Sequence, residues 1–186
     1  MIRGSATTPF ASAHALGLLT GALLMAAIGL GGALAQAPVR APAEAAGLTG
    51  KHPAEYYIEA GKLLRDGRRD DAVFVFYLGQ LRYRAHLMAR PELPPDRDPA
   101  VFSSLSAMIG RPLNEYAFGD IPQLARTIDG VLAYDAANPD AFTPPAQFAQ
   151  VYAGVRDGLE KLKAQVLKDA DSIRAARARN GLPNRG

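Results

Sequence analysis

Cysteine is absent from all 186 residues. Its absence excludes disulfides, thiolate nucleophiles and cysteine-ligated metal sites, so packing alone must stabilise the folded part. Histidine is scarce: beyond residue 35 only His52 and His86 occur, without carboxylates at metal-ligand spacing. The Gly-x-Ser-x-Gly elbow of serine hydrolases is missing as well. We therefore predict no catalytic residues, no metal site, no cofactor and no enzymatic activity.

The pattern of a half-buried strand is also missing, and no Asn-Gly or Asp-Gly hairpin signal separates two candidate strands. Apolar residues recur instead at intervals of three and four, which is typical of amphipathic helices. We predict an all-α fold: a single-domain helical bundle over residues 52–186 with a long C-terminal helix.

An uncharged apolar run, 15–34, follows Arg3 and ends in small residues shortly before Pro38. Residues 1–35 thus have the three parts of a signal peptide, and we predict cleavage after Ala35 and a periplasmic location. The alternative is an uncleaved inner-membrane anchor facing the periplasm, because about twenty apolar residues can cross a hydrocarbon core of roughly 30 Å. Residues 36–51, rich in Ala, Pro and Gly, are interpreted as a flexible leader.

Charge is nearly balanced beyond Ala35, where 20 basic residues face 18 acidic ones. A formal charge of +2 does not indicate a nucleic-acid partner. Seven basic residues nevertheless gather in 161–185, against Asp169 and Asp171. This segment is interpreted as a solvated helix end, or as a weak contact for anionic lipid head groups or an acidic protein surface.

Five helices and one short helical turn are expected. Their ranges are 53–66, 72–90, 99–109, 111–120 for the turn, 121–137 and 144–179. Because Val73–Leu78 is apolar at every position, the second helix must lie in the middle of the fold. Asp98 and Asp120 are expected to cap the helices that follow them. The last turns, beyond Val166, are expected to project past the body.

Seven residues of 53–86 fall at the offsets of a known helical repeat: Tyr56, Ala60, Leu63, Gly67, Ala72, Phe76 and Gly79. The segment resembles a single tetratricopeptide-type or Sel1-like helical hairpin. Small residues would let the two helices approach where they cross, and Gly67 would permit the tight turn. The sequence departs from the repeat at Glu59 and Arg84, and no second copy follows, so an ordinary hairpin is the alternative.

Three short stretches, HPAEYY (52–57), GQLRYR (79–84) and NEYAFGD (114–120), are similar to those of exported bacterial proteins of unassigned function. This resemblance implies a family and no activity.

Polar residues placed among apolar ones are the candidates for recognition: Tyr57, Gln80, Arg82, Tyr83, Arg84, Asn114 and Glu115. Because buried polar groups must be paired, one interpretation is that they form a core network, with Arg84 on Glu115 for example, that fixes the helix register. In the other, the five residues from Tyr57 to Arg84 line a groove for a peptide or an acidic partner. Tyrosine would then supply contact area and arginine forked hydrogen bonds.

We therefore expect an exported, non-enzymatic helical interaction or adaptor protein of the bacterial envelope, with a protein or peptide partner. The alternative is an inhibitor or immunity-type protein that neutralises a toxin or a cell-wall enzyme. A helical enzyme is a third hypothesis, and it would require two facing carboxylates in a cleft.

Overall fold

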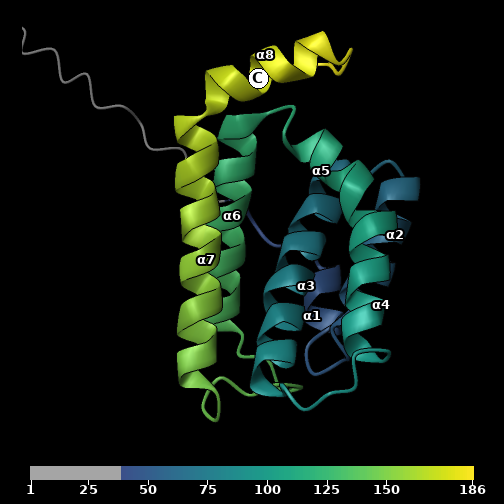
Figure 1. Cartoon of the computed structure of the whole chain (residues 1–186), viewed down its shortest axis with the longest axis vertical. Helices are drawn as coiled ribbons and strands as arrows, with labels where there is room; N and C mark the ends of the chain where they lie inside the picture. The colour runs from purple at the N-terminus through teal and green to yellow at the C-terminus, as the bar shows by residue number, and fades with distance from the viewer. Residues whose placement is uncertain (1–38) are drawn as a thin grey trace, which may run out of the picture. The chain divides into compact units, whose positions relative to one another are not determined.

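The computed structural model describes residues 39–186, and these residues form helices and connecting loops without a strand. The expected all-α class is confirmed (Figure 1). The helices are α1 Glu44–Gly47, α2 Ala54–Arg65, α3 Arg69–Ala89, α4 Asp98–Leu105, a π-helical turn at Ser106–Gly110, α5 Arg111–Ala117, α6 Ile121–Ala137, α7 Ala149–Lys168 and α8 Ala170–Arg179. The predicted signal segment, residues 1–35, lies outside the described residues.

Helix α3 is the central element, as its apolar row predicts. Every residue from Val73 to Leu78 is buried, and α3 packs against α2, α5, α6 and α7. A helix that is apolar on all sides can bury each of its faces only when other helices surround it. The position of α3 in the middle of the bundle is therefore confirmed.

Helices α2 and α3 form the expected hairpin, and two glycines explain its geometry. Gly67 lies in the turn between them with a φ of 78°, a backbone conformation that strains residues with a Cβ atom. Gly79 lies where the helices cross, and a Cβ atom added there would lie 2.5 Å from the Cβ of Tyr56. The missing side chain thus sets the spacing of the two helices. Membership of the hairpin in the tetratricopeptide or Sel1-like class stays a prediction.

Substituting Gly79→Ala is expected to lower the free energy of unfolding by about 1–3 kcal/mol, because α2 and α3 would have to move apart in the core. Urea unfolding followed by circular dichroism measures the change. The matched control is Gly154→Ala in α7, where an added Cβ would meet no atom within 4 Å. That control should gain up to about 1 kcal/mol from helix propensity. Equal behaviour of both variants would contradict this account of the crossing.

The chain does not leave its helical path at Gly110, contrary to the expectation that this residue ends a helix. Helix α4, the π-helical turn and α5 follow one another without a break from Asp98 to Ala117. Pro112 lacks the amide hydrogen that an α-helix would direct to the carbonyl of Met108, which accounts for the widened turn at this point. Gly110 is instead a packing residue, since a Cβ atom there would lie 2.8 Å from the Phe76 ring.

Residues 39–51 belong to the folded body, so their interpretation as a flexible leader is wrong. Ala45 and Leu48 are buried in the core. The carbonyl of Leu48 accepts a hydrogen bond from the Tyr56 hydroxyl at 2.8 Å, and Glu44 forms an ion pair with Arg68. Alanines give little apolar periodicity, which explains why sequence reasoning missed this packing.

The C-terminal part is not one helix over 144–179. Residues 145–147 form a turn, and helix α7 begins only at Ala149. It ends at Lys168, and α8 continues in a new direction after Asp169 (Figure 1). The last turns do not project past the body either. The amide of Arg185 donates to the carbonyl of Gly119 at 2.7 Å, which returns the chain to the body beyond α5. Helix α7 packs on the body through Tyr152, Val155 and Val166, which are buried.

Candidate functional site

Arg82 is a fully buried cation among the candidate residues, and it forms a core network. Its side chain is fully buried on α3, where Nε donates to Asp135 Oδ1 on α6 at 3.3 Å. The other guanidinium nitrogens donate to the Tyr56 hydroxyl and, at 2.6 Å, to the carbonyl of Asn138. Arg156 of α7 donates to the second Asp135 oxygen at 2.6 Å. The network therefore joins four helices, and Arg82 does not line a groove.

Tyr57 and Tyr83 are also internal. The Tyr57 hydroxyl lies 3.4 Å from Ser106 Oγ, and the Tyr83 hydroxyl donates to the carbonyl of Asp98 at 3.2 Å. Burial raises the pKa of each phenol to about 12, so both keep their protons and serve as neutral hydrogen-bonding groups. Like Arg82, they hold the fold together and present no face to a partner.

Asn114 and Glu115 are neighbours in the sequence, but they make different contacts. Asn114 accepts a hydrogen bond from the Tyr77 hydroxyl at 3.0 Å, whereas Glu115 is exposed and pairs with Arg111 at 3.3 Å. The suggested pair of Arg84 with Glu115 is wrong. Arg84 is exposed and lies instead over the Phe102 ring of α4, with 5.6 Å between its guanidinium carbon and the ring centre.

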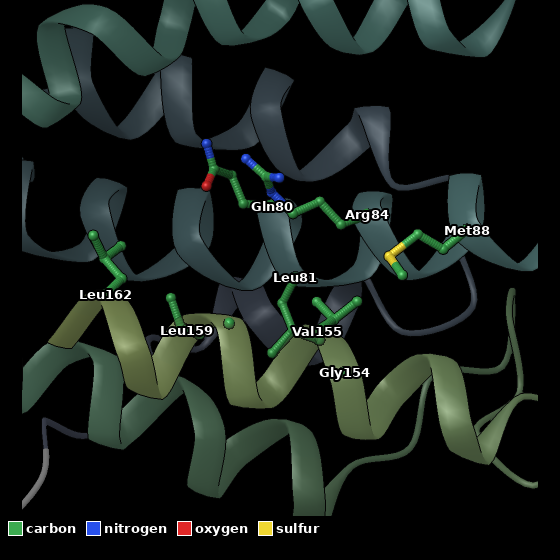
Figure 2. A pocket seen from close by; sticks show the side chains of 9 residues that line it. Gln80, Leu81, Arg84, Met88, Gly154, Val155, Leu159 and Leu162 are labelled. Carbon is green, nitrogen blue, oxygen red and sulfur yellow. The ribbon is translucent and has the colours of Figure 1, made fainter. Parts of the chain in front are cut away.

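Gln80 and Arg84 are the two candidates that line the groove between α3 and α7, which has a volume of about 370 Å³. Figure 2 shows Leu159 and Leu162 pointing from α7 toward α3, while Gln80 and Arg84 extend from the far side of α3. The lining residues are Gln80, Leu81, Arg84, Met88, Gly154, Val155, Gly158, Leu159 and Leu162. The groove is thus mostly apolar, and its polar side chains, Gln80 and Arg84, come from α3.

Two glycines of α7 keep this groove open. A Cβ atom added to Gly154 or Gly158 would meet no atom within 4 Å. These residues therefore do not serve close helix packing, unlike Gly79. Met88 is 58% exposed at the edge of the same groove. Among the described residues no carboxylate lies within ion-pair distance of Arg84. The arrangement offers apolar surface beside one cation that lacks a counter-charge.

A second cluster joins His52, His86 and Asp98, which are far apart in the sequence. Asp98 Oδ2 lies 2.7 Å from His86 Nε2 and 3.3 Å from His52 Nε2. Phe142 packs against both imidazole rings. Asp98 was expected to cap α4, but its carboxylate serves the two histidines and makes no cap bond. The start of α2, the end of α3 and the start of α4 are thereby tied together.

The hydrogen bonds of this cluster fix the proton positions. His52 Nδ1 accepts from the backbone amide of Ala54 at 3.2 Å, and His86 Nδ1 accepts from Arg90 at 2.9 Å. Each neutral ring must then carry its proton on Nε2 and donate it to Asp98. A metal bound through Nε2 would require the proton on Nδ1, facing another donor. Although the three groups lie close enough to surround an ion, this donor set does not fit one.

Ionisation in the cluster follows from the same contacts. Burial lowers the pKa of His86 below its usual value, and Arg90 and His52 lower it further against the opposing effect of Asp98. Burial acts to raise the pKa of Asp98, but the hydrogen bonds from His86 and His52 outweigh it and leave that pKa lowered. The stable state therefore contains neutral His86 and ionised Asp98.

No protein-family model matches this chain, and no curated protein or solved structure is significantly similar to it. Within residues 39–186, none of the helices combines the length and the apolar character needed to span a bilayer.

Proposed function

We propose that this chain is an exported, non-enzymatic helical interaction protein of the bacterial envelope, and that its α3–α7 groove receives a segment of a partner protein. The observation that carries the proposal is an open, mostly apolar groove with one uncompensated cation, Arg84, at its side. Export and a periplasmic location rest on the pattern of residues 1–35 alone.

The chemistry of the groove favours one kind of occupant. Leu81, Val155, Leu159 and Leu162 offer apolar contact, which favours apolar side chains in the partner. Arg84 favours a carboxylate beside them, because a guanidinium forms its strongest hydrogen bonds with carboxylate or phosphate oxygens. An amphipathic protein segment that carries an acidic residue next to its apolar stripe satisfies both conditions.

Filling the groove is expected to abolish the interaction without harming the fold. Gly158→Phe places a ring in the open space of α7, whereas the control Ala153→Phe places the same ring on an exposed position outside the groove. A photo-crosslinking amino acid at Met88, in intact cells, should give one discrete protein adduct. We expect this adduct to disappear in Gly158→Phe and to persist in Ala153→Phe.

The same experiment tests the charge at Arg84. Because a hydrogen bond to a charged group contributes about 1.5–3 kcal/mol, Arg84→Glu should weaken capture by roughly 10- to 100-fold. A crosslinker at Met108, exposed on the π-helical turn, controls for collisions at any apolar surface. No adduct from Met88, or an adduct that survives both groove variants, would contradict the proposal.

A further inference from the structure

A second hollow, of about 310 Å³, lies where the chain beyond α8 folds back onto α5. The fold-back is held by backbone carbonyls: Arg185 donates to the carbonyl of Tyr116 at 2.6 Å, and Arg177 donates to that of Pro183 at 2.8 Å. These contacts place three arginines, Arg69, Arg177 and Arg185, in the wall of one hollow.

Among the described residues, none of these three arginines forms an ion pair; Asp70, which lines an adjoining hollow with Arg69 and Arg185, accepts instead from the Tyr116 hydroxyl at 3.0 Å. Arg69 and Arg185 both lie over the Tyr116 ring, with guanidinium carbons 5.6 and 3.4 Å from its centre. Neither they nor Arg177 has a carboxylate within 4 Å among the described residues. The one carboxylate in the wall, Glu115, pairs with Arg111 instead. The Tyr116 ring and the backbone carbonyls thus hold the guanidinium groups in position, but none of them carries a full negative charge that would pair with a cation.

Two of these cations also converge. A Cβ atom added to Gly119 would lie 3.0 Å from the Tyr116 carbonyl oxygen, 3.1 Å from Arg177 Nη2 and 3.2 Å from Arg185 Nε. Two guanidinium groups that approach one point repel each other unless an anion lies between or beside them. The Tyr116 ring and carbonyl hold Arg185 in this position, but a carbonyl oxygen carries only a partial negative charge, so an anion beside the two cations would stabilise them further.

Arg177 supplies an independent sign of a missing acceptor. Its side chain is on a residue only 8% exposed, and its Nε is buried without a hydrogen-bond partner, the one such side-chain atom in residues 39–186. Buried donors in native proteins are nearly always paired, and an unpaired charged donor is especially unfavourable. A ligand oxygen that reached this nitrogen would supply the missing acceptor.

We propose that this cradle of Arg69, Arg177 and Arg185 binds a phosphate group, either as free phosphate or within the head group of an anionic lipid. A phosphate offers several acceptor oxygens and up to two negative charges, which suits three guanidinium forks around a small hollow. This site is separate from the α3–α7 groove and independent of the function proposed for it.

The test uses inorganic phosphate, with sodium chloride at equal ionic strength as the control for screening. Phosphate should raise the midpoint of thermal unfolding of the full chain, and isothermal titration calorimetry should give a dissociation constant. Arg69→Gln and Arg185→Gln should each weaken binding by about tenfold or more. Both residues are exposed, so these variants should fold. Arg179→Gln, an exposed position of α8 outside the hollow, is the matched charge control and should bind as the wild type does.

Vesicles distinguish the two sources of phosphate. Sedimentation with phosphatidylglycerol in phosphatidylcholine, against phosphatidylcholine alone, measures head-group binding. Phosphate binding that depends on Arg69 and Arg185, without vesicle binding, assigns a soluble ligand. Vesicle binding with the same dependence assigns a lipid. Equal losses in Arg179→Gln would show general attraction to anions and overturn the site, as would binding in neither assay.

Discussion

Substituting Asp135→Ala is expected to lower the free energy of unfolding by about 3–5 kcal/mol, the usual effect of removing one partner from a buried ion pair. Asp135 is fully buried and accepts from Arg82 and Arg156. Its removal leaves the Arg82 guanidinium in the core with only the Tyr56 hydroxyl and the Asn138 carbonyl as acceptors. Neither acceptor carries a negative charge, since burial raises the pKa of Tyr56 to about 12.

The matched control is Asp129→Ala on the same helix. Asp129 also pairs with a cation of α7, Lys163 at 2.6 Å, but the Asp129 side chain is 40% exposed. Exposed pairs contribute about 0–1 kcal/mol, so this control should change stability little. Urea unfolding of both variants separates the two cases. If Asp135→Ala lowers stability no more than Asp129→Ala does, the network around Arg82 is not what holds the four helices in register.

Local patterns predicted much of the bundle. The apolar row Val73–Leu78 placed α3 in the centre, and the interruption at Asn138 ended α6 where the structure ends it. The cap at Asp120 is confirmed as well, because its carboxylate accepts from the amide of Gln123 at 2.9 Å. These features depend on neighbours within a few residues along the chain, which is the range over which periodicity and capping signals act.

Features that depend on distant contacts could not be predicted in the same way. Nothing near Asp169 in the sequence marks the change of direction into α8, since neither glycine nor proline is present there. The burial of Arg82 and the exposure of Arg84 also depend on which faces α6 and α7 cover. Arg82 and Arg84 lie about half a turn apart on one helix. Tertiary packing therefore buries the first and leaves the second exposed.

The histidine cluster shows the same limit in the candidate sites. His52 and His86 are 34 positions apart, and Asp98 comes from a third segment. The α2–α3 hairpin brings the first two together, and the loop before α4 returns the carboxylate to them. The spacing of these residues in the sequence therefore does not indicate that they meet. Only the scarcity of histidine marks His52 and His86 as residues of interest.

Acidification is expected to destabilise the protein in two steps, because the cluster keeps His86 neutral and Asp98 ionised. His86 has a lowered pKa in the folded state, so below about pH 6.5 the unfolded chain binds a proton that the folded chain does not. The free energy of unfolding should then fall by up to about 1.4 kcal/mol per pH unit until the folded pKa is reached. Asp98, whose folded pKa is also lowered, should add a second decline below about pH 4.

His86→Gln isolates the first step, because a glutamine can donate to Asp98 and accept from Arg90 while it cannot titrate. Urea unfolding between about pH 8 and about pH 3 should show that this variant loses the decline that begins near pH 6.5 and keeps the one below about pH 4. Protonation of His86 would place a hydrogen on Nδ1 against the Arg90 guanidinium, which donates to that nitrogen at 2.9 Å. The charged imidazole is therefore opposed by a fixed cation as well as by burial. A wild-type stability that stays constant from pH 7.5 to pH 5, or an identical decline in His86→Gln, would show that this cluster does not control the acid response.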